Sequence, residues 1–133
     1  PLLESSLLDP MLAIARGGSL EGMELRWRPG AATTTVLASG GYPGDYPTGL
    51  PVEAPAGLAE DPGLLVFHAG TRTADGALLT SGGRVLAVTA LAPTVAEAAE
   101  RSRAAAERIR FEGKQFRRDI GWREARRQET ARA

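Results

Sequence analysis

Three basic side chains near the C-terminal end are the strongest candidates for chemistry. Lys114, Arg117 and Arg118 lie close together in the chain, and Asp119 follows them. A guanidinium presents a planar fork of N–H donors that suits bidentate binding of phosphate, and a lysine ammonium adds a point charge. In an extended segment Arg117 and Arg118 point to opposite faces, so only one of them should readily meet a given ligand. The alternative is a solvated edge strand, and the residues alone favour neither.

A glycine-rich loop is the second candidate site. Residues 39–44 read Ser-Gly-Gly-Tyr-Pro-Gly and follow a β-branched segment. Paired glycines let backbone N–H groups approach an anion or another backbone closely. The loop lacks the Gly-Lys-Ser/Thr ending of a phosphate-binding P-loop, and Ser39 lacks the Gly-x-Ser-x-Gly frame of a nucleophile elbow. The residues therefore favour a tight structural loop.

The chain contains one histidine, His68, and no cysteine. This composition excludes multi-histidine metal sites, thiolate zinc sites and disulfides. His68 falls late in a predicted strand, where a structural role is favoured because no acid–base partner can be identified. A polar turn over residues 80–84 ends in Arg84. Its donors are either solvated or meet the glycine-rich loop at one end of a sheet.

Arginines beyond residue 122 raise the question of nucleic-acid binding. Glu124 and Glu129 interrupt them, however, and the aromatic side chains that could stack on bases are few. The pattern favours a solvated terminal helix and predicts no nucleic-acid partner.

Length and composition indicate one globular domain. The 133 residues are 43% hydrophobic and 24% charged, with only 5% aromatic residues, so aliphatic side chains must form most of the core. The net charge is zero but unevenly distributed: residues 1–100 carry 5 basic and 11 acidic side chains, whereas residues 101–133 carry 11 basic and 5 acidic. No apolar run approaches the roughly 18–20 residues that span a bilayer, and no signal peptide is visible, which predicts no membrane partner.

The first element that the sequence predicts is a helix. Apolar residues at helical spacing within residues 2–16 indicate this helix, with Asp9 as its cap and Pro10 in its first turn. Gly17 and the glycine after it end the helix. Because the chain opens on Pro1 inside this apolar stretch, we expect a piece of a longer polypeptide.

Apolar and β-branched segments between turn residues predict an antiparallel sheet. They cover residues 23–27, 33–39, 64–71, 77–80 and 84–91. Asp75 and Gly76 form a strong hairpin signal, so the last three segments are expected to pair in order as an antiparallel meander.

One main helix is predicted to cover this sheet. Thr94 and Glu97 have the spacing of a capping box, and small residues recur at helical spacing as far as Ile109. Residues 114–120 are a candidate final edge strand, and residues 122–132 a helical tail. The fold class is therefore α+β, an antiparallel sheet of a meander plus one earlier strand covered by one helix.

Four motifs, in this order, resemble those of one protein family. They are Ala-Ser-Gly-Gly-Tyr-Pro-Gly-Asp-Tyr at 38–46, Val-Phe-His-Ala-Gly-Thr at 66–71, Gly-Gly-Arg-Val-Leu-Ala-Val-Thr-Ala at 82–90 and Arg-Arg-Asp-Ile-Gly at 117–121. Together they resemble the C-terminal portion of the phosphoribosylamine–glycine ligases, also called glycinamide ribonucleotide synthetases. These are ATP-grasp enzymes of purine biosynthesis, and the resemblance covers about residues 1–123.

The resemblance implies an ATP-dependent carbon–nitrogen ligase. In that family ATP activates glycine as an acyl phosphate, which the amine of 5-phosphoribosylamine attacks to give glycinamide ribonucleotide, ADP and phosphate. ATP and Mg²⁺ (or Mn²⁺) would be bound by residues outside this chain, so the chain alone is expected to be inactive and to hold neither a catalytic residue nor a metal. The expected partners are these small molecules and the N-terminal domains of the same polypeptide, in the cytoplasm.

The resemblance also implies domain boundaries. Residues 1–22 would close the ATP-grasp region, residues 23–125 would form the C-terminal ligase domain, and residues 126–133 would be an arginine-rich tail. Related enzymes of the pathway bind the sugar phosphate with an Arg-Arg or Arg-Lys pair in this domain, which carries over to Arg117 first and Arg118 second. Lys114 is a weaker candidate.

The glycine-rich loop acquires a role from the same resemblance. Gly40, Gly41, Tyr42 and Pro43 would lie at the interdomain cleft and border the substrate. The alternative is a domain that braces the enzyme without touching a ligand.

Overall fold

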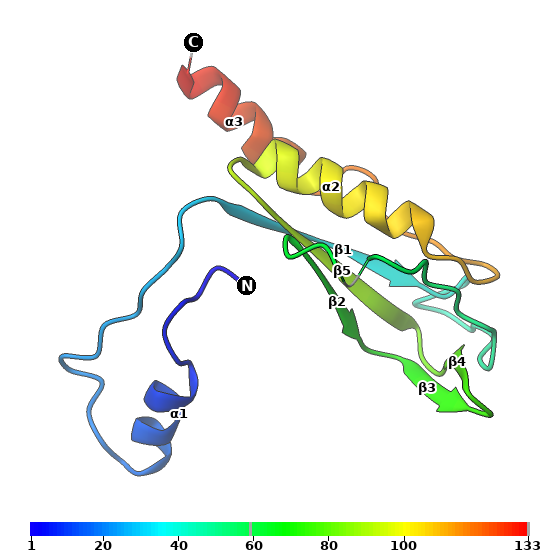
Figure 1. Ribbon diagram of the computed structural model, residues 1–133, viewed down its shortest axis with the longest axis horizontal. Coiled ribbons are helices and arrows are strands. Elements are labelled where there is room, and N and C mark those ends of the chain that lie inside the picture. The colour runs from blue at the N-terminus through cyan, green and yellow to red at the C-terminus, as the bar shows by residue number, and fades with distance from the viewer. Residues whose placement is uncertain (59, 133) are drawn as a thin grey trace.

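The computed structural model describes residues 1–58 and 60–132. It confirms the α+β class: the helix α2 (Val95–Arg108) lies across one face of a three-stranded antiparallel sheet (Figure 1). The strand order is β1-β5-β2, where β1 covers Ala31–Ala38, β5 Arg84–Ala92 and β2 Leu64–His68. The central strand is therefore β5, which pairs on both sides.

The alternation of side chains along β1 defines a covered and an open face of the sheet. Thr33, Thr35 and Leu37 are buried, and the residues between them are exposed, because successive side chains in a strand point to opposite faces. The covered face packs on α2. The core between them is mainly aliphatic and includes Leu37, Val85, Leu86, Val88, Ala105, Ala106 and Ile109.

The helix α2 begins where the capping-box spacing predicts. The Oγ1 atom of Thr94 accepts a hydrogen bond from the backbone N–H of Glu97 at 3.2 Å. Farther along, the buried Ser102 Oγ lies 2.7 Å from Thr35 Oγ1 and donates to the Val88 carbonyl oxygen at 2.8 Å. This satisfied buried hydroxyl fixes the position of the helix over β1 and β5.

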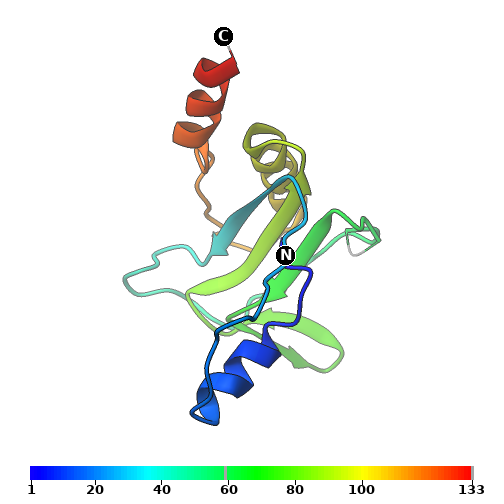
Figure 2. The same cartoon turned by 90° about the vertical axis from the view of Figure 1, so that its left-hand side faces the viewer.

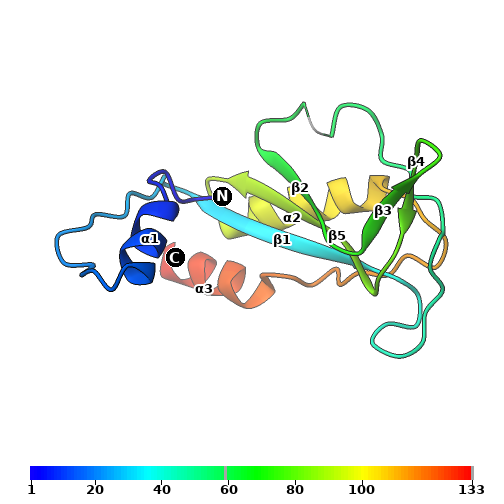
Figure 3. The same cartoon turned by 90° about the horizontal axis from the view of Figure 1, so that it is seen from below.

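The third and fourth strands differ from the predicted meander. β3 (Thr71–Ala74) and β4 (Ala77–Thr80) pair with each other in a separate two-stranded hairpin and not with β5 (Figure 3). The predicted turn between them is present, with φ values of 51° at Asp75 and 76° at Gly76. Positive φ at both positions is what a tight hairpin turn requires.

A close crossing of two glycines explains why this hairpin leaves the sheet. A Cβ atom on Gly70 would lie 2.6 Å from the Cα of Gly82, so the outgoing and returning chains touch only because neither residue has a side chain. The backbone N–H of Gly70 still donates to the Arg84 carbonyl oxygen at 2.7 Å. Pairing with β5 therefore ends at this crossing, and the hairpin continues alone.

The edge strand predicted over residues 114–120 is reduced to a single bridge between Gln115 and Ala38 at the end of β1. Beyond it, the chain is held by side chains instead of strand hydrogen bonds. Phe116 packs against the core, and Arg118 pairs with Glu107 of α2. These contacts draw the segment along α2 and away from the edge of β1.

The N-terminal helix is shorter than predicted. α1 covers Leu8–Ala15, so Asp9 lies in its first turn and does not cap it, whereas Ser6 Oγ accepts the Asp9 backbone N–H at 3.3 Å. Pro10 lies within the first turn, where its missing N–H costs no helical hydrogen bond. No residue of α1 is buried, and Figures 1 and 2 show α1 on the side of the sheet opposite α2.

The strand predicted over residues 23–27 is also replaced by a short contact. Leu3 and Trp27 form an isolated antiparallel bridge, and the backbone N–H of Arg28 donates to the Leu2 carbonyl oxygen at 2.9 Å. The pairing stops there because Pro29 and the glycine after it turn the chain toward β1. The predicted helical tail is present as α3 (Trp122–Arg132). Of the helices in the described residues, none is long and apolar enough to cross a membrane.

Candidate functional site

The glycine-rich loop and the polar turn meet at one end of the sheet. The backbone N–H of Ser39 donates to the Gly83 carbonyl oxygen at 2.8 Å, and Ser39 Oγ donates to the Gly82 carbonyl oxygen at 3.0 Å. A Cβ atom on Gly83 would collide with the ring of Tyr42. The turn therefore meets the loop, but through the carbonyl oxygens of Gly82 and Gly83, which accept from Ser39, and not through the donors of the turn that the sequence suggested.

Backbone packing accounts for both glycines of the loop. A Cβ atom on Gly40 would lie 2.8 Å from the Gly113 carbonyl oxygen. Gly41 has a φ of 98°, and a Cβ there would collide with the Asp45 carbonyl oxygen. These contacts give the tight structural loop that the residues favoured, and they hold Tyr42, which is followed by a cis peptide bond to Pro43.

Gln115 fastens this loop to the segment that carries the arginines. Its Nε2 atom donates to the carbonyl oxygens of Ser39 at 3.1 Å and of Tyr42 at 2.9 Å. Gln115 was not among the residues predicted from the sequence, because its partners lie 76 and 73 positions earlier in the chain. No local pattern signals such a distant pair of acceptors.

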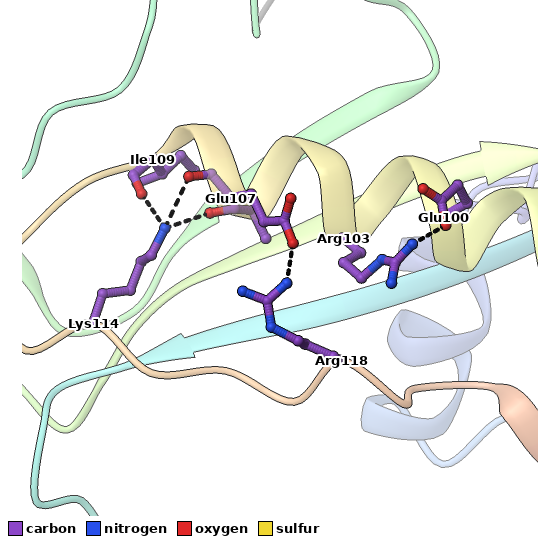
Figure 4. Close-up of polar contacts among 7 residues, drawn as sticks. Glu100, Arg103, Glu107, Ile109, Lys114 and Arg118 are labelled. Atoms are coloured by element: carbon purple, nitrogen blue, oxygen red, sulfur yellow. Dashed lines mark hydrogen bonds and ion pairs between the residues drawn. The ribbon is translucent and has the colours of Figure 1, made fainter.

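Arg117 and Arg118 point in different directions, as their adjacency in an extended segment predicted. The Nε and Nη2 atoms of Arg117 donate to the two carboxylate oxygens of Asp119 at 2.9 and 2.7 Å. Arg118 instead forms an ion pair with Glu107 on α2 (Figure 4). The two guanidinium groups therefore have different partners, Asp119 for Arg117 and Glu107 for Arg118.

A pocket of about 460 Å³ brings Arg117 together with the glycine-rich loop. It opens at the end of β1 and β5 where the loop, the polar turn and the Gln115 segment converge. Its lining is formed by Val36, Ala38, Tyr42, Arg84, Gln115, Phe116 and Arg117. Arg118 does not line this pocket but one on the α2 side.

Arg117 and Asp119 form an ion pair that shifts the pKa of each group. The hydrogen bond from Arg117 lowers the pKa of the Asp119 carboxyl below its ordinary value, and the same contact raises the pKa of Arg117. Both side chains are more than half exposed, so water screens this pair. The guanidinium stays charged, and Asp119 faces its Nε and Nη2 edge.

Lys114 does not face the pocket. Its Nζ atom donates to the carbonyl oxygens of Ala106 at 2.9 Å, Glu107 at 3.1 Å and Ile109 (Figure 4). Burial lowers the pKa of Lys114 below its ordinary value. The side chain therefore satisfies the last carbonyl groups of α2, a structural role that the sequence did not reveal.

His68 also has a local partner. Its Nδ1 atom lies 2.9 Å from Thr71 Oγ1, across the bend between β2 and β3. Within residues 1–58 and 60–132, no three metal-ligating side chains lie close enough together to hold a metal ion.

The chain matches known proteins over most of its length. Residues 32–123 match the family model of the phosphoribosylglycinamide synthetase C domain. The phosphoribosylamine–glycine ligase of Chlorobaculum tepidum is 49% identical over 121 residues, which are 91% of this chain and 28% of that protein. The trifunctional purine biosynthetic protein adenosine-3 of Gallus gallus is 42% identical over 123 residues, or 92% of this chain and 12% of that protein.

A solved structure agrees with these matches. The crystal structure of the phosphoribosylamine–glycine ligase from Thermotoga maritima superposes with a TM-score of 0.69 and 38% identity, over 84% of this chain and 26% of that one. The chain thus spans between a tenth and a third of the length of the relatives it matches. On the family model and these identities together, the chain belongs to the phosphoribosylglycinamide synthetase C-domain family.

Proposed function

We propose that this chain is the C-terminal part of a ligase that joins glycine to 5-phosphoribosylamine with consumption of ATP, in purine biosynthesis. The observation that carries the proposal is the identity of 49% and 48% to two bacterial proteins named phosphoribosylamine–glycine ligase, over 91% of this chain. ATP and Mg²⁺ (or Mn²⁺) would be held by other parts of that polypeptide. The cytoplasm remains the expected compartment.

Arg117 is the residue that we assign to the sugar phosphate. A guanidinium has five N–H donors, and Asp119 accepts two of them through Nε and Nη2. The remaining donors on the Nη atoms are available to the phosphate oxygens. Binding a phosphate remote from the reacting amine would hold that amine in position, so that binding energy contributes to the rate.

The glycine-rich loop would form the wall of the substrate cleft beside Arg117. Tyr42 lines the same pocket, and Gln115 holds the loop in place through two carbonyl oxygens. Gly40, Gly41 and Pro43 would shape this wall through their backbone. Arg118, paired with Glu107 on the α2 side, is the weaker candidate for a phosphate contact.

A bracing domain without ligand contacts is the second candidate function. Two observations favour it: Asp119 already occupies one edge of the Arg117 guanidinium, and backbone packing alone accounts for Gly40 and Gly41. Under this alternative, the pocket would be an incidental gap between converging loops.

The domain boundaries at residues 22 and 125 are part of the same proposal. They are supported by the absence of buried residues in α1 and by a core that begins at Thr33. Residues 1–22 would then pack on the ATP-grasp region of the polypeptide. The tail at 126–133 lies in α3 as far as residue 132, and residue 133 is outside the described residues.

The test is ADP release by the intact polypeptide, dependent on both glycine and 5-phosphoribosylamine, with and without Arg117→Ala. Activity that falls strongly in the variant would support ligase function and the phosphate contact together. Equal activity in both proteins would leave the ligase assignment in place and favour the bracing alternative. A folded polypeptide that forms no glycinamide ribonucleotide would refute the proposed function.

A further inference from the structure

An extra residue in β5 changes which face of the sheet Arg84 occupies. Val36 pairs with Ala87 and Leu37 with Leu86, but Ala38 pairs with Arg84, so Val85 has no partner of its own on β1. This is a β-bulge, in which two residues of one strand oppose one residue of the other. In a regular strand, Arg84 would lie on the same face as Leu86, beneath α2.

The bulge instead places Arg84 on the open face. Val85 and Leu86 are both fully buried, and the next residue back along the strand is exposed. Directly paired residues share a face, so Arg84 lies on the same side as Ala38 and, two positions earlier, Val36, which is 40% exposed. Bulges commonly redirect a side chain in this way beside functional sites.

Arg117 reaches the same face from the other side of β1. Gln115 bridges to Ala38, and Arg117 lies two residues farther along an extended segment, so it shares the face of Gln115. Arg84 and Arg117 consequently line one pocket from the two flanks of β1. Arg118, one residue on, is turned to α2.

The two arginines that line the pocket differ in whether a carboxylate balances their charge. The Arg117 charge is balanced by Asp119, whereas Arg84 forms no ion pair with any described residue. A dianionic phosphomonoester would therefore meet one oriented but balanced guanidinium and one unbalanced guanidinium. We propose that Arg84 and Arg117 together bind the phosphate group of the substrate, with Arg84 as a further substrate-binding residue; this rests on the proposed function.

The experiment compares Arg84→Ala, Arg84→Lys, Arg117→Ala and the double variant in the intact polypeptide. Arg72→Ala is the matched control, because Arg72 is an exposed arginine on the neighbouring hairpin and does not line the pocket. One readout is KM for 5-phosphoribosylamine against KM for glycine and for ATP. The other is calorimetric binding of ribose 5-phosphate against ribose, which requires no turnover.

We expect Arg84→Ala to raise KM for 5-phosphoribosylamine and Kd for ribose 5-phosphate by about tenfold or more, the size of a lost charge-assisted hydrogen bond. KM for glycine and ATP should change less than about twofold. Arg84→Lys should retain part of the affinity, and the double variant should lose less than the product of the single effects, because both residues bind one group.

Two failures are distinguishable. If the polypeptide ligates glycine but Arg84→Ala and Arg84→Lys behave like Arg72→Ala, the role of Arg84 is refuted while the proposed function stands. If the polypeptide does not ligate, the calorimetric comparison still decides whether Arg84 contributes to phosphate binding. Binding of ribose as tight as that of ribose 5-phosphate would refute the phosphate contact in either case.

Discussion

At the scale of single residues, neighbouring side chains of one chemical type have different partners. Arg117 is oriented by Asp119 beside Tyr42, and Arg118 pairs with Glu107. Their alternation was predictable from an extended backbone, since it follows from local geometry. The sequence could not predict which of the two arginines faces the pocket, because that depends on where α2 lies.

We expect Arg117→Ala and Arg118→Ala to separate these roles. Arg117→Ala should cost about 1.5–3 kcal/mol in transition-state binding, measured as the loss of kcat/KM for 5-phosphoribosylamine. Arg118→Ala should lower kcat/KM by the equivalent of less than about 1 kcal/mol, because Arg118 pairs with Glu107 and does not line the pocket of Arg117 and Tyr42. The reverse ranking would move the phosphate contact to Arg118 and to the α2 side.

Lys114 offers a prediction about stability instead of binding. Lys114→Met keeps the apolar stem and removes the ammonium that donates to three carbonyl groups at the end of α2. We expect the free energy of unfolding in urea to fall by about 1–2 kcal/mol, since partly buried acceptors at the end of α2 lose their donor. The control is Arg110→Met, which removes an exposed positive charge nearby. It should change the free energy of unfolding by less than about 0.5 kcal/mol.

At the scale of elements, the sequence predicts best what is determined by a few adjacent residues. Thr94 and Glu97 give the start of α2, and Asp75 with Gly76 gives the β3–β4 turn. The bulge at Val85 was not predictable, because it is defined by β1, which is distant in sequence, and the crossing at Gly70 depends on a close approach to Gly82 that no local pattern encodes. For the same reason the predicted meander and the final edge strand were wrong in their pairing, although the α+β class is confirmed.

The loop before β2 is tied to α2 by a carboxylate. Asp61 accepts hydrogen bonds from the backbone N–H of Gly63 at 2.8 Å and from Arg101 Nη2 at 3.0 and 2.9 Å. The Gly63 N–H, followed by Arg101, lowers the pKa of Asp61 below its ordinary value of 3.8. The folded state therefore favours the ionised form.

This shift makes stability depend on pH on the acidic side. With a folded pKa below the unfolded one, Asp61 stabilises the fold at pH values above 3.8, and this contribution is lost as the pH falls through the lowered pKa. Asp61→Asn should therefore lower the urea midpoint at pH 7. In acid, the midpoint of the variant should approach that of the parent chain. Glu21→Gln, at an exposed N-terminal carboxylate, is the control, and a constant difference at all pH values would contradict the assignment.

At the scale of the whole molecule, residues 1–28 contribute no buried residue to the core of the sheet and its helix. No residue of α1 is buried, and Met11 and Ile14 are 58% and 62% exposed. Removing residues 1–28 should leave the free energy of unfolding of the remaining chain within about 0.5 kcal/mol, because no core contact is lost. A loss above about 1 kcal/mol, measured in urea, would show that the N-terminal residues stabilise the sheet.

The bulge in β5 has a consequence for length variation in this strand. Deleting Val85 would pair Arg84 and Leu86 with Ala38 and Leu37 in regular register, so the guanidinium would keep its side of the sheet. The deletion would remove one buried side chain, worth about 1.5–3 kcal/mol of stability, and the carbonyl oxygen that accepts the Ala69 N–H at 3.1 Å after β2. We expect a chain without Val85 to unfold at lower urea but to bind ribose 5-phosphate with little change. A shorter β5 would thus still present the Arg84 guanidinium on the open face of the sheet. An alanine scan would not test this, because it keeps the length of the strand.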